Sequence, residues 1–172
     1  SKPEVSDDGL NVTIPLRRDV LFHDGSRFDA KAMAFSLNRF LRIGSQRYLL
    51  SDRIAAIETP NTFEIRLRLK HPSSSIESLL TSPYLTPVSP QAYADHADRF
   101  LNDRFVGTGP YTLNSFRNTQ QRLLPFRNYW GTPPNNVGLD LINLSNSTAL
   151  FGAVVSGEVD VLLSNSIDED QK

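Results

Sequence analysis

Histidine, aspartate and serine side chains are the groups in this chain that could carry acid–base or nucleophilic chemistry. His23 and Asp24 are adjacent, within the sequence Phe22-His23-Asp24-Gly25. A Ser-His-Asp triad is recognised by its geometry, and the chain has no Gly-x-Ser-x-Gly turn of the kind that exposes a nucleophilic serine. The frequency of chance motif matches favours His23 as a turn residue with a local hydrogen bond. An α+β hydrolase or transferase domain that uses His23, Asp24 and a serine brought close by folding remains an alternative.

Metal and phosphate sites are not indicated by the sequence. The histidines are His23, His71 and His96, and none has the partner three or four residues away that a helical metal pair requires. Gly107-Thr108-Gly109 lacks the Lys-Ser/Thr pair of a phosphate-binding loop and leads into a strand rather than a helix. The chain contains no cysteine, which removes thiolate ligands, disulfides and thiol nucleophiles. We therefore expect no metal, no cofactor and no catalytic residue.

Tyrosine and tryptophan side chains are the more informative candidates, because they combine apolar area with a polar atom, as residues that line receptor sites do. This group comprises Tyr48, Tyr84, Tyr111, Tyr129 and Trp130. Trp130 precedes Gly131-Thr132-Pro133-Pro134, and the usual burial of large aromatic residues favours Trp130 as a structural plug with a hydrogen-bonded indole.

Length and charge are typical of a globular body that does not bind nucleic acid. A chain of 172 residues can bury a real core. Lys and Arg number 18 against 19 Asp and Glu, and both signs are scattered, so no basic stripe forms. No apolar run approaches the ~20 residues that span a bilayer, and residues 1–4 do not resemble a signal peptide. We expect a soluble chain whose export signal has been removed or lies outside this sequence.

The first part of the chain shows strand periodicity, followed by helix periodicity. A turn at Asp7-Asp8-Gly9 leads into alternating apolar residues over 12–16, which predicts a half-buried strand. Pro15 cannot donate a ladder hydrogen bond, so this strand should be bulged or at a sheet edge. Asp29 is expected to cap a helix that ends at Gly44.

A hairpin and two short helices are expected next. Residues 54–57 and 63–69 flank a turn, and the second run alternates between apolar and charged residues. Ser74 and Glu77 match a capping box for a short helix that Pro83 terminates. Prolines at 83, 87 and 90 predict an extended segment over Tyr84–Val88, followed by a helix over residues 91–97.

The last third of the chain predicts a second group of strands. We expect strands over 110–116, 121–127 and 139–144. A helix over 148–155, closed by Gly157, then leads to a strand over 159–163. The last strand pair and its helix would form a β-α-β unit with parallel strands. The fold class is therefore α+β, with a mixed, largely antiparallel sheet, short flanking helices and a C-terminal β-α-β segment.

Several motifs recur in an order that is more specific than any one of them. They lie at 5–10, 16–25, 28–30, 106–116, 128–130 and 156–160. Together they resemble the extracytoplasmic solute-binding proteins of bacterial peptide and nickel ABC importers, family 5, of the dipeptide/oligopeptide-binding type. The resemblance implies a fragment of the first lobe of a two-lobed, periplasmic-binding-protein-like fold. Residues 1 to about 105 would form the subdomain of the peptide-binding members, and about 106–172 would belong to the main sheet of that lobe.

The resemblance also implies candidate ligand-binding residues. In the family, an aromatic residue after the first long helix tends to face the ligand, and this position falls on Tyr48. Tyr84, Thr86 and Thr108 lie in segments that the family places near the cleft. Nickel-binding relatives carry an arginine in the stretch that corresponds to Ser82–Thr86. This chain has none there, so a nickel ligand is less expected.

The function implied by the resemblance is non-catalytic binding of a small peptide-like ligand and its delivery to a membrane permease. Location would be periplasmic or at the bacterial cell surface, with membrane contact only through the permease or through a lipid anchor outside this segment. A nickel-chelate or sugar receptor of the same family is an alternative cargo. A protein-interaction module is a third class of function, beside the hydrolase.

Overall fold

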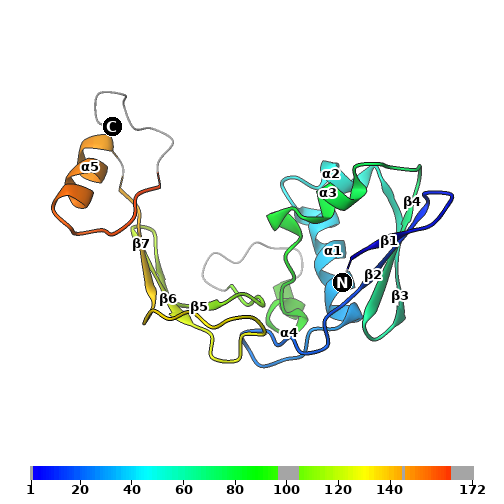
Figure 1. Ribbon diagram of the computed structural model, residues 1–172, viewed down its shortest axis with the longest axis horizontal. Coiled ribbons are helices and arrows are strands. Elements are labelled where there is room, and N and C mark those ends of the chain that lie inside the picture. Colours follow the sequence, from blue (N-terminus) through cyan, green and yellow to red (C-terminus); the bar gives the residue numbers. More distant parts are fainter. Residues whose placement is uncertain (1, 97–104, 145, 164–172) are drawn as a thin grey trace.

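The computed structural model describes residues 2–96, 105–144 and 146–163. The described chain contains a four-stranded and a three-stranded sheet. Figure 1 shows two bodies: the first sheet covered by helices, and the second sheet extending away from it toward the C-terminal helix. The first sheet contains β1 (Glu4–Val5), β2 (Asn11–Pro15), β3 (Ile54–Asn61) and β4 (Glu64–Leu69). Its order is β1-β2-β4-β3, and all its pairs are antiparallel. The second sheet contains β5 (Tyr111–Arg117), β6 (Gln120–Pro125) and β7 (Leu139–Ile142), in that order and antiparallel.

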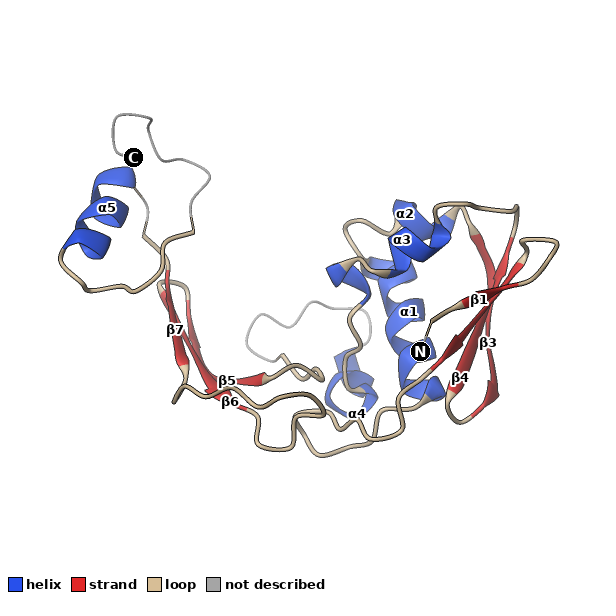
Figure 2. Cartoon of the chain, in the orientation of Figure 1, coloured by secondary structure: helices blue, strands red, loops and turns tan. Residues whose placement is uncertain are grey.

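Helices are concentrated on one side of the first sheet, as Figure 2 shows. They are α1 (Ala30–Ile43), α2 (Tyr48–Ser51), α3 (Ile76–Leu80) and α4 (Pro90–Tyr93), with 3₁₀ turns at Pro83–Leu85 and Ala94–His96. A further helix, α5 (Ser147–Val155), follows the second sheet. The predicted hairpin, the helix after Asp29 and the strands of the second sheet are confirmed. The helix predicted over 91–97 is confirmed as far as residue 96, and Ala97 lies outside the described residues.

The main core forms where the apolar face of β4 meets α1. Ile65 and Leu67 have no exposed surface, because alternation along β4 turns both toward the helix. Leu37 and Phe40 of α1 cover them and belong to the same cluster of buried residues. Fully burying each such side chain stabilises the fold by about 1.5–3 kcal/mol, so this contact contributes several kcal/mol to the stability of the first body.

Pro15 shows how β2 tolerates a residue without an amide hydrogen. β2 lies between β1 and β4 rather than at a sheet edge, so the predicted edge position is wrong for the strand as a whole. However, β1 pairs only with Val12 and Thr13, whereas Pro15 pairs with Glu64 of β4. Pro15 therefore lies beyond the end of β1, where its missing donor would have no acceptor.

β3 is one of the two outer strands of the first sheet and is irregular. Its pairing with β4 shifts register between Ile54 and Ala56 and again between Glu58 and Asn61. Pro60 lies within the second irregular stretch, which is a position that an outer strand allows.

The ends of α1 are set by Asp29 and Gly44. The Asp29 side chain accepts a hydrogen bond from the Ala32 amide at 2.8 Å, so the predicted cap is confirmed. Gly44 ends the helix at φ −60°, which any residue could adopt. A Cβ at this position would lie 2.6 Å from the Phe40 ring and carbonyl oxygen. Close packing, rather than left-handed backbone, therefore calls for glycine here.

Two predictions for the segment after β4 are wrong. The capping box does not form, because α3 begins one residue later than expected, with Ser75 as its N-cap and no side-chain hydrogen bond; Ser74 belongs to the preceding turn. The segment Tyr84–Val88 is extended only from Thr86 onward. Pro83 begins a 3₁₀ turn and the Ser82 hydroxyl accepts from the Tyr84 amide, which together bend the chain before it extends.

The predicted β-α-β unit is wrong. Residues 159–163 pair with no strand among those described, and Val161 and Leu163 are 76% and 92% exposed. An apolar alternating run becomes a strand only where a neighbouring strand supplies hydrogen-bond partners. α5 itself is confirmed, with Asn146 as its N-cap and Gly157 at φ +75° after its end.

Replacing Gly44 by alanine should destabilise the first body by about 1–3 kcal/mol, because the new methyl group overlaps Phe40. Gly152 is the matched control: its Cβ would meet no atom within 4 Å, so Gly152→Ala in α5 should be neutral or stabilising by up to about 1 kcal/mol. Urea unfolding gives both values. A Gly44→Ala chain as stable as the unmodified chain would contradict the packing account.

Candidate functional site

The turn over Phe22–Ser26 is built around Asp24. Gly25 adopts φ +82°, and its amide donates to the Phe22 carbonyl at 2.9 Å. The Asp24 carboxylate accepts from the amide and hydroxyl of Ser26 at 3.0 and 2.6 Å. Its other oxygen accepts a hydrogen bond from the hydroxyl of Ser89, a residue with no exposed surface. Asp24 is therefore a structural acceptor that ties this turn to the start of α4.

The pKa of Asp24 reflects two opposing effects. Partial burial is the largest single effect and would raise the pKa of the carboxyl group. Hydrogen bonds from the Ser26 and Ser89 hydroxyls and from the Ser26 amide together outweigh it and hold the pKa below its usual value. The ionised form is consequently the one that the fold stabilises.

The His23 imidazole contacts a loop distant in sequence. Its Nε2 lies 3.0 Å from the Gly109 carbonyl oxygen, and its Nδ1 lies 3.3 Å from the Gly107 amide nitrogen and 3.4 Å from the Phe105 carbonyl oxygen. The ring also packs edge-on against Phe126, with centroids 5.0 Å apart. The prediction of a turn residue is confirmed, but the prediction of a purely local hydrogen bond is wrong.

This geometry does not form a Ser-His-Asp triad among the described residues. A triad needs the imidazole between a serine and a carboxylate. Here both ring nitrogens of His23 face main-chain groups, and the serines that contact Asp24 donate directly to it. Neither His23 nor Asp24 is arranged to activate a nucleophile.

Trp130 joins the second sheet to the same loop. Its indole Nε1 donates to the Thr108 carbonyl at 3.0 Å, which confirms the predicted hydrogen-bonded indole. The Arg17 guanidinium lies 4.6 Å from the centre of its ring. Trp130 is nevertheless 37% exposed, so it is not a buried plug. The Arg17 guanidinium, rather than an apolar core, covers one face of the ring.

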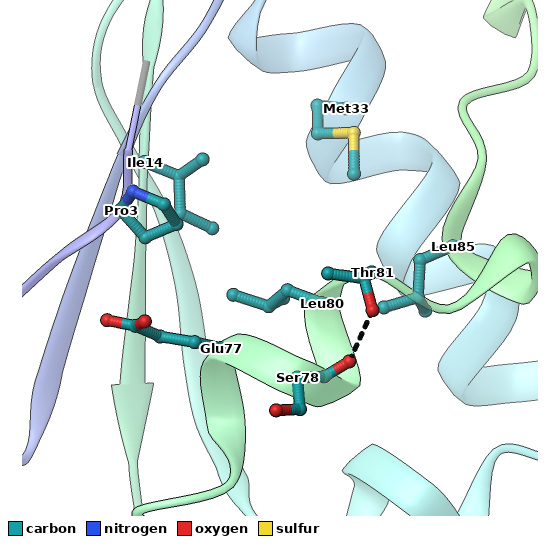
Figure 3. Close-up of a pocket in the computed structure, with 8 residues that line it drawn as sticks. All are labelled: Pro3, Ile14, Met33, Glu77, Ser78, Leu80, Thr81 and Leu85. Carbon is teal, nitrogen blue, oxygen red and sulfur yellow. Dashed lines mark hydrogen bonds between the residues drawn. The ribbon is translucent and has the colours of Figure 1, made fainter.

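One depression in the described part of the surface, of about 450 Å³, is mainly apolar. Figure 3 shows Ile14 and Pro3 on one side of it, with Met33, Leu80 and Leu85 facing them and Glu77 near its edge. Separate segments of the chain supply these residues, so no local sequence pattern marks the depression. None of the predicted ligand-binding residues lines it.

A smaller depression of about 150 Å³ brings two of the predicted residues together. Tyr84 and Thr86 line it, and Tyr84 is 54% exposed. The rest of its lining comes from α1 and the segments around it: Ser36, Arg39, Phe40, Gly44, Ser45 and Val88. Tyr48 is 58% exposed at the start of α2, and neither Tyr48 nor Thr108 lines this depression. The structure thus groups half of the predicted set.

Arg39 is the charged residue in this depression that sequence reasoning missed. Its guanidinium lies 4.9 Å from the centre of the Tyr93 ring. Burial raises the pKa of Tyr93, while a hydrogen bond with the main chain of Val106 and the charge of Arg39 act in the opposite direction. No local sequence signal marks Arg39, because α1 meets the segment carrying Tyr84 and Thr86 only in the folded chain.

Residues 2–96, 105–144 and 146–163 offer neither a metal-binding cluster nor a helix that could span a membrane. No three His, Asp or Glu side chains gather closely enough to hold a metal ion. None of the helices there is long and apolar enough to cross a membrane.

Comparison with protein families gives a match over the whole chain. The model of the family described as "Bacterial extracellular solute-binding proteins, family 5 Middle" matches residues 1–172. The chain is 36% identical over 129 residues to the glutathione-binding protein GsiB of Salmonella paratyphi A. That alignment covers 73% of this chain and 25% of GsiB. The chain thus spans about a quarter of the length of this relative.

Solved structures show the same architecture. The chain superposes on the binding protein AgaA of A. tumefaciens R10, solved in complex with agropinic acid, with a TM-score of 0.84 and 29% identity. It also superposes on NikZ of Campylobacter jejuni, solved with Ni(L-His), with a TM-score of 0.84 and 21% identity. Each superposition covers 92% of this chain and 33% of the other. The α+β, periplasmic-binding-protein-like fold is confirmed, and the likeness to NikZ shows the fold alone.

The Asp24–Ser89 hydrogen bond should make stability depend on pH. Because the folded-state pKa of Asp24 is lowered, its stabilising contribution is present above the ordinary value near 3.8 and is lost as the pH falls through the lower folded-state value. Urea unfolding of Asp24→Asn, Ser89→Ala and the double variant should give a coupling energy of about 1 kcal/mol at pH 7, modest because Asp24 is exposed. That coupling should decrease as the pH is lowered through the folded-state pKa of Asp24, because a protonated carboxyl group is a weaker acceptor. Equal coupling at pH 7 and in acid would contradict the role of the ionised carboxylate.

Proposed function

Because the chain belongs to family 5 of the bacterial extracellular solute-binding proteins, we propose that it forms part of a non-catalytic receptor for a peptide-like ligand. The receptor would deliver its ligand to the permease of an ABC importer. The observation that carries the proposal is the family match over residues 1–172. In such a receptor, two lobes close around the ligand and the closed form is presented to the permease.

The chain would be a segment of the first lobe of that receptor. Residues 1 to about 105 would form the subdomain of the peptide-binding members, and about 106–172 would belong to the main sheet of the lobe. Support comes from the distribution of the sheets, since all of β1–β4 precedes residue 70 and all of β5–β7 follows residue 110. Coverage of 33% of AgaA is consistent with one part of a larger receptor.

Catalysis by His23 and Asp24 is disfavoured as an alternative function. A general base needs a ring nitrogen that can reach the proton it removes. The His23 nitrogens are instead engaged by main-chain groups of residues 105–109. The engagement of both nitrogens supports the non-enzymatic character that is general in the family.

The ligand contacts would come from Tyr48, Tyr84, Thr86 and Thr108. Tyr84 and Thr86 are the best supported, because they share a depression with Arg39. The Thr86 hydroxyl donates to the Pro83 carbonyl at 2.9 Å, so its oxygen can still accept a hydrogen bond from a ligand amide. The Tyr84 ring offers a stacking surface. Such a set suits a short peptide backbone. A nickel chelate is less favoured, since Ser82–Thr86 lacks the arginine that the resemblance places in this stretch of nickel-binding relatives.

Location outside the cytoplasm follows from the same proposal. The family is described as extracellular, and we place the receptor in the periplasm or at the cell surface of a bacterium. Contact with the membrane would be made through the permease or through a lipid anchor outside this segment.

Ligand binding can be tested in the longer receptor that contains this segment. Glutathione and a dipeptide serve as probes, with affinity measured by titration calorimetry. Tyr84→Ala should weaken binding of the better probe about tenfold, the effect of losing one well-packed aromatic contact. Tyr48→Ala should weaken it as well. Val137→Ala is the control, because Val137 is 85% exposed and lies in neither depression. Unchanged affinity in Tyr84→Ala and Tyr48→Ala would remove both residues from the site.

The 172-residue chain alone should bind either probe only weakly, with a dissociation constant weaker than about 1 μM. Tight small-ligand sites enclose most of the ligand surface, whereas the depression at Tyr84 is only about 150 Å³. Titration of the isolated chain checks this expectation. Binding at or below the micromolar range would show that the segment carries a complete site.

A further inference from the structure

The loop over residues 105–110 lies between the two sheets, and its main chain is held by groups from the first body. The Ser89 amide donates to the Val106 carbonyl at 2.9 Å, and the His23 amide donates to the Gly107 carbonyl at 2.9 Å. Ser89 also caps α4 by accepting from the Ala92 amide at 3.2 Å. One side of the loop is thus fixed to the Asp24 turn and to α4.

The His23 imidazole holds the same loop by both ring nitrogens. A neutral imidazole with its proton on Nε2 donates to the Gly109 carbonyl and accepts from the Gly107 amide, so one tautomer satisfies both contacts. The Phe105 carbonyl contact, at 3.4 Å, is the longest of the three and would need the proton on Nδ1. The side-chain and main-chain contacts of His23 join two segments that are far apart in the sequence, since His23 and Gly107 are 84 residues apart.

Trp130 holds the loop from the second body. It follows β6, and its indole donates to the Thr108 carbonyl, the main-chain acceptor between the two glycines that His23 holds. Arg17, which follows β2 of the first sheet, lies over the Trp130 ring. The loop, the first body and the second body therefore meet at these side chains.

We propose that His23 and Trp130 are positioning residues that fix the loop over 105–110 and, through it, the angle between the two sheets. Gly109 and Pro110 lead directly into β5, so a fixed loop fixes the direction in which the second sheet leaves. The same contacts fix Thr108. That last consequence matters for ligand binding only if the proposed function is correct, whereas the fixed angle does not depend on it.

The angle can be measured with two spin labels, one on each sheet. The absence of cysteine allows Ala55→Cys in β3 and Ser115→Cys in β5, both exposed, to carry the labels. The distance distribution should be narrow in the parent chain and broaden in His23→Ala. His71→Ala, at an exposed histidine after β4, is the control and should leave it narrow. Trp130→Phe keeps an aromatic ring but removes the indole donor, and it should also broaden the distribution. This variant tests the proposal independently, should His23→Ala fail to fold.

Amide exchange separates positioning from a general loss of stability. Asparagine at position 23 can place an acceptor near the Nδ1 position, and glutamine can place a donor near the Nε2 position. The Gly107 amide should therefore exchange about fivefold faster in His23→Gln than in His23→Asn, the effect of one hydrogen bond. Exchange in the core of β4 should be equal in the two variants. A merely structural role would change the Gly107 and β4 amides together.

Unchanged distance distributions in both His23→Ala and Trp130→Phe, or equal Gly107 exchange in the Asn and Gln variants, would overturn the positioning role. Broadened distributions combined with unchanged glutathione or dipeptide affinity in the longer receptor would uphold the fixed angle and count against Thr108 as a ligand contact.

Discussion

Main-chain polar groups in the loop before β5 need hydrogen-bond partners, and the arrangement of the two sheets depends on where those partners lie. No strand pairs with residues 105–109 in the described part of the chain, and unpaired main-chain groups in a partly buried loop are costly. His23, Ser89 and Trp130 supply the partners from both bodies. Because these contacts come from two directions, satisfying the loop also joins the four-stranded sheet to the three-stranded one.

Much of the fold was predictable because its causes are local. Asp29 caps a helix through a contact three residues away, and the β3–β4 hairpin follows from alternation along one run of sequence. The failures have equally plain causes. The predicted N-cap, Ser74, lies one residue before the observed N-cap, Ser75, and capping preferences do not resolve a difference of one residue. The run over 159–163 has strand periodicity, but periodicity does not supply a neighbouring strand.

Only part of the candidate site could be predicted, because only some of its contacts are local in sequence. Tyr84 and Thr86 are close in sequence, so their grouping needed little tertiary information. Arg39 and Ser45 join them because α1 packs beside the 3₁₀ turn, and this contact depends on the whole core. The role of His23 was the hardest to foresee. Its partners are the main-chain groups of Gly107 and Gly109. Because any residue type provides such groups, the sequence does not indicate that His23 would contact them.

The irregular outer strand β3 has a consequence for behaviour in a crowded compartment. A regular outer strand offers a continuous row of free amide and carbonyl groups, on which a strand from another chain can assemble. β3 is irregular at two places along its length, and the second of them contains Pro60, which has no amide hydrogen. The β3 edge of the four-stranded sheet is therefore a poor template for the addition of a strand from another chain.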